Sequence, residues 1–442
     1  MLSLTIAAPL LAMFFYFRRS ANTFSSTRWP AIAAAFFSLV CATVTAWVTL
    51  TSGQAWSEGL LELDALACVP LVLFAALVLI SILAAPKVDQ NPRFMASLMA
   101  VSAGTLAAYA ASDLRLFCVG WALTLIPAFL GPSSEMMGAR VVGVVSLGCL
   151  LLASFVGLGW PAFVLLATAA LLRKGIFPFH FWAPSAFEKG SPVVWSLFLN
   201  GHLAALLLAR FGLKLFPELS KEALGLISAF ALLTAIYAAL LAMVEKSTPR
   251  LIALLSLSQA SFILAGFESR NAEGISGATL HWIVVALATT GMTIAYRLVE
   301  ARSPKAANPI GFLGLGGRMP RLAAFFLVSA LALVGLPGTL GFVAEDLLFH
   351  GAIESHPLLG LALPLATALN AITILRLFFR LFLGQPAVSL PQVPDAKPIE
   401  RLALSACVVA LLLGGLFPQV LINMRQPAAD AVAAMLALAS PE

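Results

Sequence analysis

Charged residues are scarce in this chain. They make up 10% of its 442 residues, and apolar residues make up 61%, whereas soluble domains carry roughly 25% charged residues. The chain also has no long polar stretch in which a soluble domain could fold. These absences exclude a soluble enzyme and a nucleic-acid-binding domain. They indicate a polytopic membrane protein, because a helix crosses a bilayer with about 20 apolar residues.

Cysteine is also sparse, with five residues that all fall in apolar segments. None belongs to a Cys-x-x-Cys pair or to a cysteine–histidine cluster, so the sequence suggests no disulfide, zinc or iron–sulfur site. Buried free thiols are the simplest interpretation. No pattern indicates a metal, a redox cofactor or a catalytic site, and any catalysis is therefore expected in a partner protein.

About 14 apolar segments have the length of a membrane span. They lie at 2–17, 29–50, 66–85, 94–111, 114–131, 140–159, 161–177, 191–211, 222–243, 250–267, 277–297, 321–343, 356–381 and 401–422. The first segment has no basic start and no cleavage site, and we interpret it as a retained helix. The expected fold is a single all-α membrane domain. Its parts are N-terminal helices (1–93), a first repeat (94–211), a second repeat (222–381), and a Pro-rich loop with the last helix and tail (382–442).

The tail at 424–442 is weakly amphipathic, so it either lies on the membrane surface or packs on a neighbour. The charge of the loops predicts the orientation, because basic loops stay on the cytoplasmic side. The loops at 18–28, 87–93, 246–250 and 297–321 are basic, whereas the loop near 58–64 is acidic. We therefore expect an inner (plasma) membrane protein with its N-terminus outside. The exception is a basic group on the opposite side, formed by Arg210, Lys214 and Lys221.

Two of the apolar segments are interrupted. The segment 171–192 (LLRKGIFPFHFWAPSAFEKGSP) breaks near Gly175 and Pro178, and the segment 331–350 breaks around Pro337. The breaks are about five predicted helices apart, which is typical of two inverted repeats with polar sites at their interface. The alternative is that glycine and proline are simply common in membrane helices. Both breaks also carry charge, which favours the repeats.

Ionisable side chains at membrane depth are costly there and are therefore the candidate functional residues. Arg173 and Lys174 precede the first break and point about 100° apart on a helix. Each lies on an ion path or snorkels from a helix end. His202 and His281 are either satisfied core residues or proton relays. Glu345 follows the second break and is the candidate terminal proton carrier.

Three further ionisable residues are secondary candidates. His180 lies inside the first break, and Asp346 follows Glu345 directly. Asp113 stands at the start of an apolar segment, where an interfacial position is the simpler interpretation.

The segment that runs from Arg173 through PFHFWAPSAFEKGSPV to the next helix resembles the antiporter-like membrane subunits of respiratory complex I. That family also includes subunits of membrane-bound hydrogenases, Mrp-type cation/proton antiporters and inorganic-carbon-uptake systems. Segments 247–267, 277–291 and 318–348 are similar to further parts of the same family. The resemblance covers residues 94–381 and implies two inverted five-helix repeats with flanking helices.

The resemblance also implies roles for single residues. Arg173 falls where the family usually has a pumping lysine, and His202 falls where the next helix usually has a second lysine. His281 matches a family histidine, and Glu345 matches the terminal ionisable residue of the second broken helix. Gln259 stands where a histidine is common and is a further secondary candidate.

Several positions depart from the family pattern. Ala122 replaces a glutamate that pairs with the first lysine, Val285 replaces a histidine, and Thr289 replaces a lysine. Arg173 is a poor substitute for a titrating lysine, because a guanidinium does not deprotonate in proteins. Either Lys174 takes the role of the titrating lysine, or Arg173 is a fixed charge that tunes His202, or part of the conduction path is lost.

The expected function is therefore proton conduction by one subunit of a hetero-oligomeric membrane complex. The path would run from Arg173 and Lys174 through His202 and His281 to Glu345. Proton movement would be coupled to chemistry in a partner, which is either a quinone or hydrogenase redox module or a CO2-hydrating module for inorganic-carbon uptake. The alternatives are a Mrp-like cation/proton antiporter subunit and a degenerate, non-conducting scaffold that anchors a partner.

Overall fold

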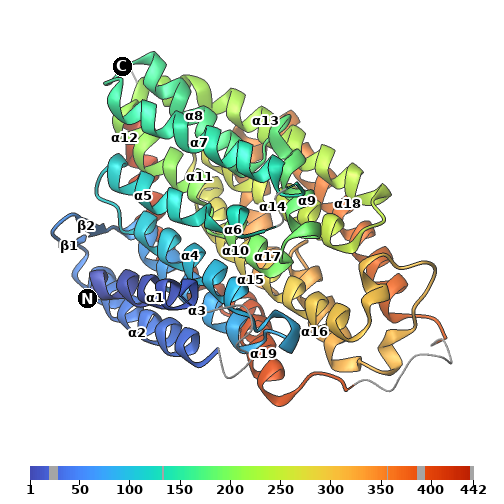
Figure 1. The fold of residues 1–442 in the computed structure, drawn as a ribbon. Coiled ribbons are helices and arrows are strands. Elements are labelled where there is room, and N and C mark those ends of the chain that lie inside the picture. Colours follow the sequence, from blue (N-terminus) through green and yellow to red (C-terminus); the bar gives the residue numbers. More distant parts are fainter. Residues whose placement is uncertain (19–27, 132–133, 356, 386–393, 439–442) are drawn as a thin grey trace.

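The computed structural model describes residues 1–18, 28–131, 134–355, 357–385 and 394–438. Parts of four predicted segments lie outside these residues, namely 19–27 in the first basic loop, 356 at the start of the apolar segment 356–381, 386–393 in the Pro-rich loop and 439–442 in the tail. The described chain is helical except for one short hairpin, which confirms the all-α membrane fold (Figure 1).

The N-terminal part contains two apolar helices, the hairpin and two further helices. Its elements are α1 (Leu2–Phe17), α2 (Arg28–Ser52), β1 (Trp56–Glu58), β2 (Leu61–Leu63), α3 (Ala65–Leu83), η1 (Lys87–Asp89) and α4 (Pro92–Tyr109). The Asp64 carboxylate caps α3 by accepting from the Ala67 N–H at 2.9 Å, and Asn91 caps α4 by accepting from the Phe94 N–H at 2.9 Å. Such caps fix where the apolar segments begin. The hairpin was not predicted.

The next part contains two longer helices, α7 and α8, with short helices before and after them. Its elements are α5 (Leu114–Thr124), α6 (Ile126–Leu130), α7 (Met137–Phe155), α8 (Trp160–Lys174), η2 (Phe179–Phe181), α9 (Trp182–Lys189), α10 (Pro192–Asn200), α11 (Leu203–Leu206), the π-helical η3 (Leu207–Gly212) and α12 (Leu213–Leu215). The predicted segment 191–211 was expected to be continuous, and the structure corrects this, because the helix stops at Asn200 and restarts at Leu203.

The remaining part contains the longest helices. Its elements are α13 (Pro217–Val244), α14 (Thr248–Glu268), α15 (Ala272–Arg302), η4 (Pro304–Ala307), η5 (Leu315–Gly317), α16 (Pro320–Ala332), α17 (Leu340–Ser355), α18 (Pro357–Phe382), α19 (Pro398–Leu416) and α20 (Pro418–Leu438). The predicted segment 321–343 ends earlier than expected, because α16 stops at Ala332 and a separate helix follows the break.

Nine of the described helices are long and apolar enough to cross a membrane, or up to ten if α8 and the bent segment after it form one span. Three shorter apolar helices accompany them, at Leu2–Phe17, Leu114–Leu130 and Pro320–Ala332. Every one of the predicted apolar segments falls on helix, although several of these helices are shorter or more broken than a simple span.

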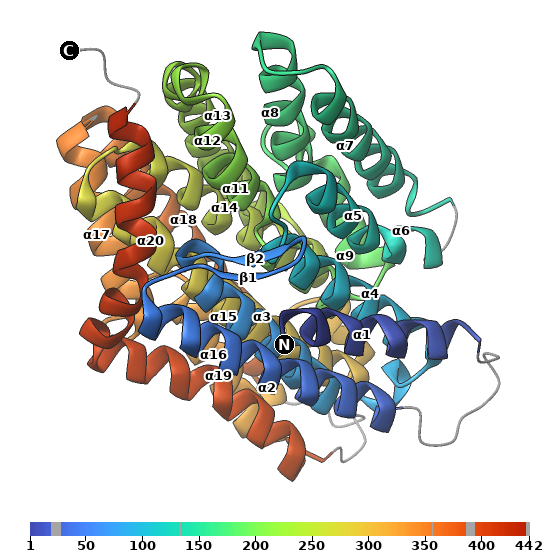
Figure 2. The same cartoon turned by 90° about the vertical axis from the view of Figure 1, so that its left-hand side faces the viewer.

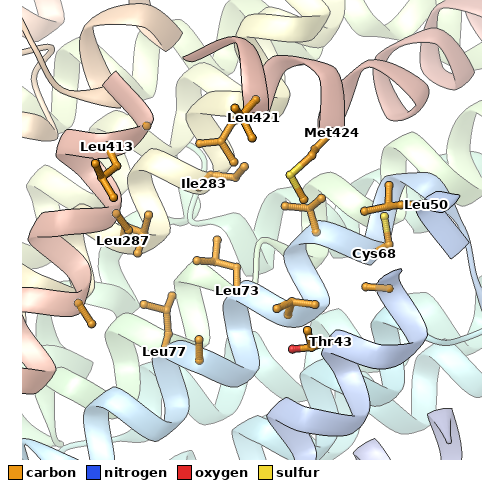
Figure 3. A pocket seen from close by; sticks show the side chains of 18 of the residues that line it. Thr43, Leu50, Cys68, Leu73, Leu77, Ile283, Leu287, Leu413, Leu421 and Met424 are labelled. Carbon is orange, nitrogen blue, oxygen red and sulfur yellow. The ribbon is translucent and has the colours of Figure 1, made fainter. Parts of the chain in front are cut away.

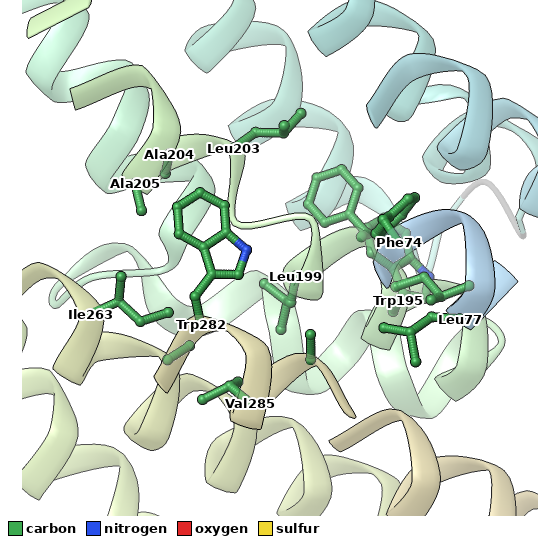
Figure 4. Close-up of a cluster of buried hydrophobic side chains, with 14 of the residues drawn as sticks. Phe74, Leu77, Trp195, Leu199, Leu203, Ala204, Ala205, Ile263, Trp282 and Val285 are labelled. Carbon is green, nitrogen blue, oxygen red and sulfur yellow. The ribbon is translucent and has the colours of Figure 1, made fainter. Parts of the chain in front are cut away.

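The centre of the bundle is formed by α14, α15 and the broken helix α10–α11, whose residues are almost all buried. Helices α1 and α2 lie on one side of this centre and α7, α8 and α13 on the other (Figures 1 and 2). Trp282 of α15 is completely buried, and Figure 4 shows its indole beside Leu203, Ala204 and Leu199. This apolar cluster holds the broken helix against α15.

Helix α20 includes most of the predicted amphipathic tail and packs against α15 and α3. Figure 2 shows it on the same face as the hairpin. Its Arg425 is buried and donates from Nη1 to the Leu66 carbonyl at 2.9 Å. Nearby, the Asp64 carboxylate forms an ion pair with Arg210 at 2.5 Å. This ion pair gives the buried Arg210 a partner of opposite charge.

An apolar groove of about 710 Å³ lies between α2, α3, α15, α19 and α20. Figure 3 shows Leu73, Leu77, Leu413 and Met424 among the side chains that line it. Its lining contains no charged side chain. The groove is therefore not where the ionisable candidates meet.

Candidate functional site

Three helices in the described part of the chain are interrupted in the interior. Helix α8 ends at Lys174 because Gly175 adopts a left-handed conformation (φ 70°), and a cis Phe177–Pro178 peptide follows. Helix α10 ends before His202, which also lies in the left-handed region with φ 41°. A non-glycine residue with positive φ is uncommon and points to a constrained position.

The third break separates α16 from α17. Gly335 and Gly338 have φ values of 69° and 86° there. Gly341 packs so closely on the end of α16 that a Cβ atom would lie 1.8 Å from the Ala332 carbonyl oxygen. Both predicted breaks, after α8 and after α16, are therefore confirmed, whereas the break at His202 was missed.

The structure brings Lys174 and His202 together. The Lys174 Nζ lies 2.9 Å from His202 Nδ1, and the two residues are only 4% and 1% exposed. The ammonium donates and the imidazole nitrogen accepts, since Lys has no acceptor when it is charged. The pair can pass a proton from one nitrogen to the other over a single hydrogen bond.

Arg173 points elsewhere, as the expected angle between adjacent residues predicts. Its Nη1 donates to the Thr124 hydroxyl at 2.8 Å. The guanidinium carbon lies 4.4 Å from the ring centre of Trp121 and 4.1 Å from that of Phe198. No ion pair to a carboxylate is found for Arg173 in the described part of the chain.

Asn200 ties the end of α10 to α15. Its Nδ2 donates to the Thr290 hydroxyl at 2.9 Å, and its Oδ1 accepts from the Thr289 hydroxyl at 2.9 Å. The next residue is also held, because the Tyr109 hydroxyl donates to the Gly201 carbonyl at 2.9 Å. These bonds fix the two residues that precede His202 and thereby help to place its imidazole.

His281 and Glu345 lie at either end of a second polar group. His281 is fully buried, and its Nε2 lies 3.1 Å from the Gln259 carbonyl oxygen. When the Gln259 amide is oriented to satisfy its neighbours, its nitrogen donates to Glu345 Oε1 at 3.2 Å and its oxygen accepts from Asn370 Nδ2 at 3.2 Å. Glu345 also accepts from the Thr367 hydroxyl at 3.3 Å. Gln259 thus connects the backbone beside His281 with the Glu345 carboxylate.

The Glu345 carboxylate lines a cavity of about 330 Å³ between α17 and α18. Pro364 and Thr367 of α18 and Phe342 and Asp346 of α17 also line it. Asp346, however, is half-exposed and lies 3.5 Å from the exposed His350. The two adjacent carboxylates therefore differ in exposure, since Glu345 is partly buried and Asp346 is exposed.

The other secondary candidates lie apart from these groups. His180 is half-buried, and its ring contacts Phe177 and Tyr237 with centroid distances of 6.0 and 5.0 Å. The Asp113 carboxylate caps α5 by accepting from the Leu116 N–H at 2.8 Å. The interfacial interpretation of Asp113 thus agrees with a capping role.

Four polar residues of the site were not among the candidates predicted from sequence, namely Thr124, Thr290, Thr367 and Asn370. Each contacts a candidate or its neighbour. The signal that could have found them is a polar residue inside an apolar segment, which is rare unless it has a partner. Trp121 and Phe198 carry no such signal, because aromatic side chains are ordinary in membrane helices.

Comparison with known proteins supports the resemblance seen in the sequence. Residues 152–370 match the family described as NADH:quinone oxidoreductase/Mrp antiporter, transmembrane region. The chain is 29% identical over 427 residues to NAD(P)H-quinone oxidoreductase chain 4 1 of Synechococcus elongatus, which covers 87% of this chain and 79% of that protein. It is also 29% identical over 265 residues to NADH-quinone oxidoreductase subunit M of Mycobacterium tuberculosis, which covers 59% of this chain and 48% of that subunit.

Solved structures show the same fold over the full length. A chain of respiratory complex I from Thermus thermophilus superimposes with a TM-score of 0.83 at 24% identity, covering 99% of this chain and all (100%) of that one. A chain of the Mrp complex from Dietzia sp. superimposes with a TM-score of 0.79 at 18% identity, covering 99% of each chain. The chain therefore belongs to the family of antiporter-like membrane subunits that NADH:quinone oxidoreductases and Mrp antiporters share.

Proposed function

We propose that this chain conducts protons across the membrane as one subunit of a larger complex. The observation that carries the proposal is the buried contact of 2.9 Å between Lys174 and His202. Two groups that both exchange protons are costly to bury in a membrane and are found there chiefly on ion paths. In this proposal Lys174 takes the part that a lysine at position 173 has in the family.

The path we propose continues from His202 to His281 and Glu345. His202 Nε2 and His281 Nδ1 are buried and have no hydrogen-bond partner among the described residues. Buried polar atoms of this kind are usually satisfied by ordered water. Water between the two imidazoles would join the Lys174 pair to the Gln259–Glu345 group, and the cavity beside Glu345 would lead outward.

The same proposal includes the repeats and the orientation. Residues 94–211 and 222–381 would form two inverted five-helix repeats within about 14 membrane helices. The breaks after α8 and after α16 support this, because the first follows the buried Arg173 and Lys174 and the second precedes the partly buried Glu345. The basic loops would face the cytoplasm and the N-terminus would lie outside.

The chemistry that drives or uses the protons would reside in partner subunits. Similar proteins are named as subunits of quinone oxidoreductases, and one similar structure is of an Mrp complex. The partner we propose is a redox module like that of a quinone oxidoreductase. A CO2-hydrating module would instead be driven by protons that move down their gradient along the same path. Exchange of protons for another cation would use the proton gradient in the same way.

The test is proton flux into proteoliposomes that contain the full chain with its co-purifying partners. Lys174→Met, His202→Asn and Glu345→Gln are each expected to lower flux by about tenfold or more, because each removes a proton-exchanging group. Asparagine is chosen at 202 because it tolerates the left-handed conformation there.

Matched controls are Lys189→Met and Glu354→Gln, which remove the same charges at exposed positions of α9 and α17. They should conduct like the wild type. Equal flux in all five variants would refute conduction along this path. A wild-type complex without flux would instead favour the non-conducting scaffold, for which the Ala122 and Arg173 departures are the observation in support.

A further inference from the structure

Arg173 is a buried cation without a carboxylate partner. The residue is 4% exposed, and its only hydrogen bond in the described structure joins Nη1 to the Thr124 hydroxyl at 2.8 Å. Its Nη2 has no partner among the described residues. Because the side chain turns inward to Thr124, it does not snorkel to a membrane surface.

Two aromatic rings contact the guanidinium instead. The Cζ atom lies 4.4 Å from the Trp121 ring centre and 4.1 Å from the Phe198 ring centre, well inside the distance of about 6 Å at which cation–π attraction acts. This attraction is largest where water is excluded, and Trp121 and Phe198 are 0% and 4% exposed.

Both rings are held in place by their own neighbours. The Trp121 indole N–H donates to the Ser146 hydroxyl at 3.2 Å, which fixes the plane of the ring. The Phe198 ring contacts Trp182 and Trp195 at centroid distances of 5.6 and 5.1 Å, both edge-on. The rings are therefore set in position by α7, α9 and α10, and the guanidinium binds to a surface that already exists.

We propose that Trp121 and Phe198 form an aromatic clamp that holds the Arg173 guanidinium without an ion pair to a carboxylate. The clamp and Thr124 hold the guanidinium in one place, on the residue that directly precedes Lys174 of the Lys174–His202 pair. Trp121 and Phe198 are thus positioning residues, which act through Arg173. The clamp itself does not depend on conduction, whereas its influence on Lys174 and His202 rests on the proposed function.

A clamp has a different consequence from an ion pair. A carboxylate neutralises a cation and can itself take up the proton, so the pair can switch between charged and neutral states. Aromatic rings leave the positive charge in full and exchange no proton. Arg173 therefore contributes a constant charge, and any change of protonation on this side of the chain is left to Lys174 and His202.

The test replaces Phe198 by 3,4,5-trifluorophenylalanine in the full chain. Fluorine withdraws electron density from the ring face but changes its size little, so packing is largely kept while cation–π attraction falls. The apparent unfolding constant in mixed micelles is measured in the wild-type background and in an Arg173→Met background. The expected increase is about 2- to 30-fold when Arg173 is present, and no comparable increase is expected in the Arg173→Met chain.

Phe187 is the matched control, because its ring is completely buried in α9 and has no cation–π contact among the described residues. Trifluorination there should have the same small effect in both backgrounds. Equal effects of fluorination at Phe198 in both backgrounds would overturn the clamp. Proton flux is then measured on the same chains and should fall when Phe198 is fluorinated and Arg173 is present.

The two measurements separate the two proposals. If fluorination acts only through Arg173 but the wild-type complex shows no flux, the clamp is supported and conduction is refuted. If flux is present but fluorination acts equally in both backgrounds, conduction is supported and the clamp is refuted.

Discussion

Asn200 offers the sharpest test of how the broken helix is held. Three hydrogen bonds join its side chain to α15: the nitrogen donates to the Thr290 hydroxyl at 2.9 Å and to the Ala286 carbonyl at 3.4 Å, and the oxygen accepts from the Thr289 hydroxyl at 2.9 Å. Asn200→Leu keeps a similar side-chain volume but removes all three bonds. The end of α10 would then be joined to α15 by apolar contacts alone, and these bring little gain where the surroundings are already apolar.

The expected loss follows from the number of bonds. A hydrogen bond between membrane helices contributes about 0.6 kcal/mol on average, so three such bonds contribute about 2 kcal/mol. This corresponds to an increase of about 30-fold in the unfolding constant. The assay is reversible unfolding of the full chain in mixed micelles. Under folding conditions we also expect lower proton flux, because His202 is two residues further along the chain.

The control is Asn423→Leu, the same substitution at an exposed position of α20. Its effect should stay within about 0.5 kcal/mol, as is usual for surface positions. If both variants changed stability equally, the bonds of Asn200 would not hold the break. If Asn200→Leu lost stability but kept full flux, the placement of His202 by α15 would not matter for conduction.

Two further predictions concern a loop carboxylate and a glycine. Partial burial raises the pKa of Glu245, but hydrogen bonds from Arg250 and from two backbone N–H groups outweigh this, and the net pKa lies below the ordinary 4.5. A lowered pKa stabilises the fold above the ordinary value, and this stability is lost as the pH falls through the lowered one. On acidification, the free energy of unfolding of the wild type should therefore fall by up to about 1 kcal/mol more than that of Glu245→Gln, measured for both chains as a function of pH. A parallel pH dependence in the two chains would contradict this. Gly341→Ala should cost about 2 kcal/mol or more, because its Cβ would lie 1.8 Å from the Ala332 oxygen. Gly148→Ala in α7, where a Cβ meets nothing within 4 Å, should be neutral or stabilising by about 1 kcal/mol, and the reverse order of the two variants would show that the third break is not closely packed.

The sequence predicted the helices and two of the three breaks for clear physical reasons. Apolar length is a strong signal for helices in a membrane. Glycine and proline beside charge marked the ends of α8 and α16. The break at His202 has no proline, and its one turn signal is the Asn200–Gly201 dipeptide inside an apolar segment. The positive φ of 41° falls on the next residue, His202, which is not a residue type that marks such a conformation as glycine does. The hairpin at Trp56–Leu63 consists of two strands of three residues each, which are too short to produce an alternating pattern.

The partners within the site were less predictable. The angle between Arg173 and Lys174 indicated that they face different neighbours, but not which one meets His202. That choice depends on how α8, α10 and α15 pack, which is a tertiary property. The family pattern directed attention to Arg173, whereas the structure places Lys174 at the 2.9 Å contact. The two rings beside Arg173 belong to α5 and α10, and only the folded chain brings them together.

The early end of α8 has a consequence for how the chain is made. The helix has 15 residues and is about 22 Å long at 1.5 Å per residue, which is shorter than the hydrocarbon core of about 30 Å. It also ends in two cations, each of which costs up to about 3 kcal/mol to insert near the middle of a bilayer. We therefore expect the translocon to reject α8 as an independent segment. Its final placement would wait for α10, which supplies Phe198 to Arg173 and precedes His202, so that the membrane topology of this region is completed only after the following helix has been synthesised.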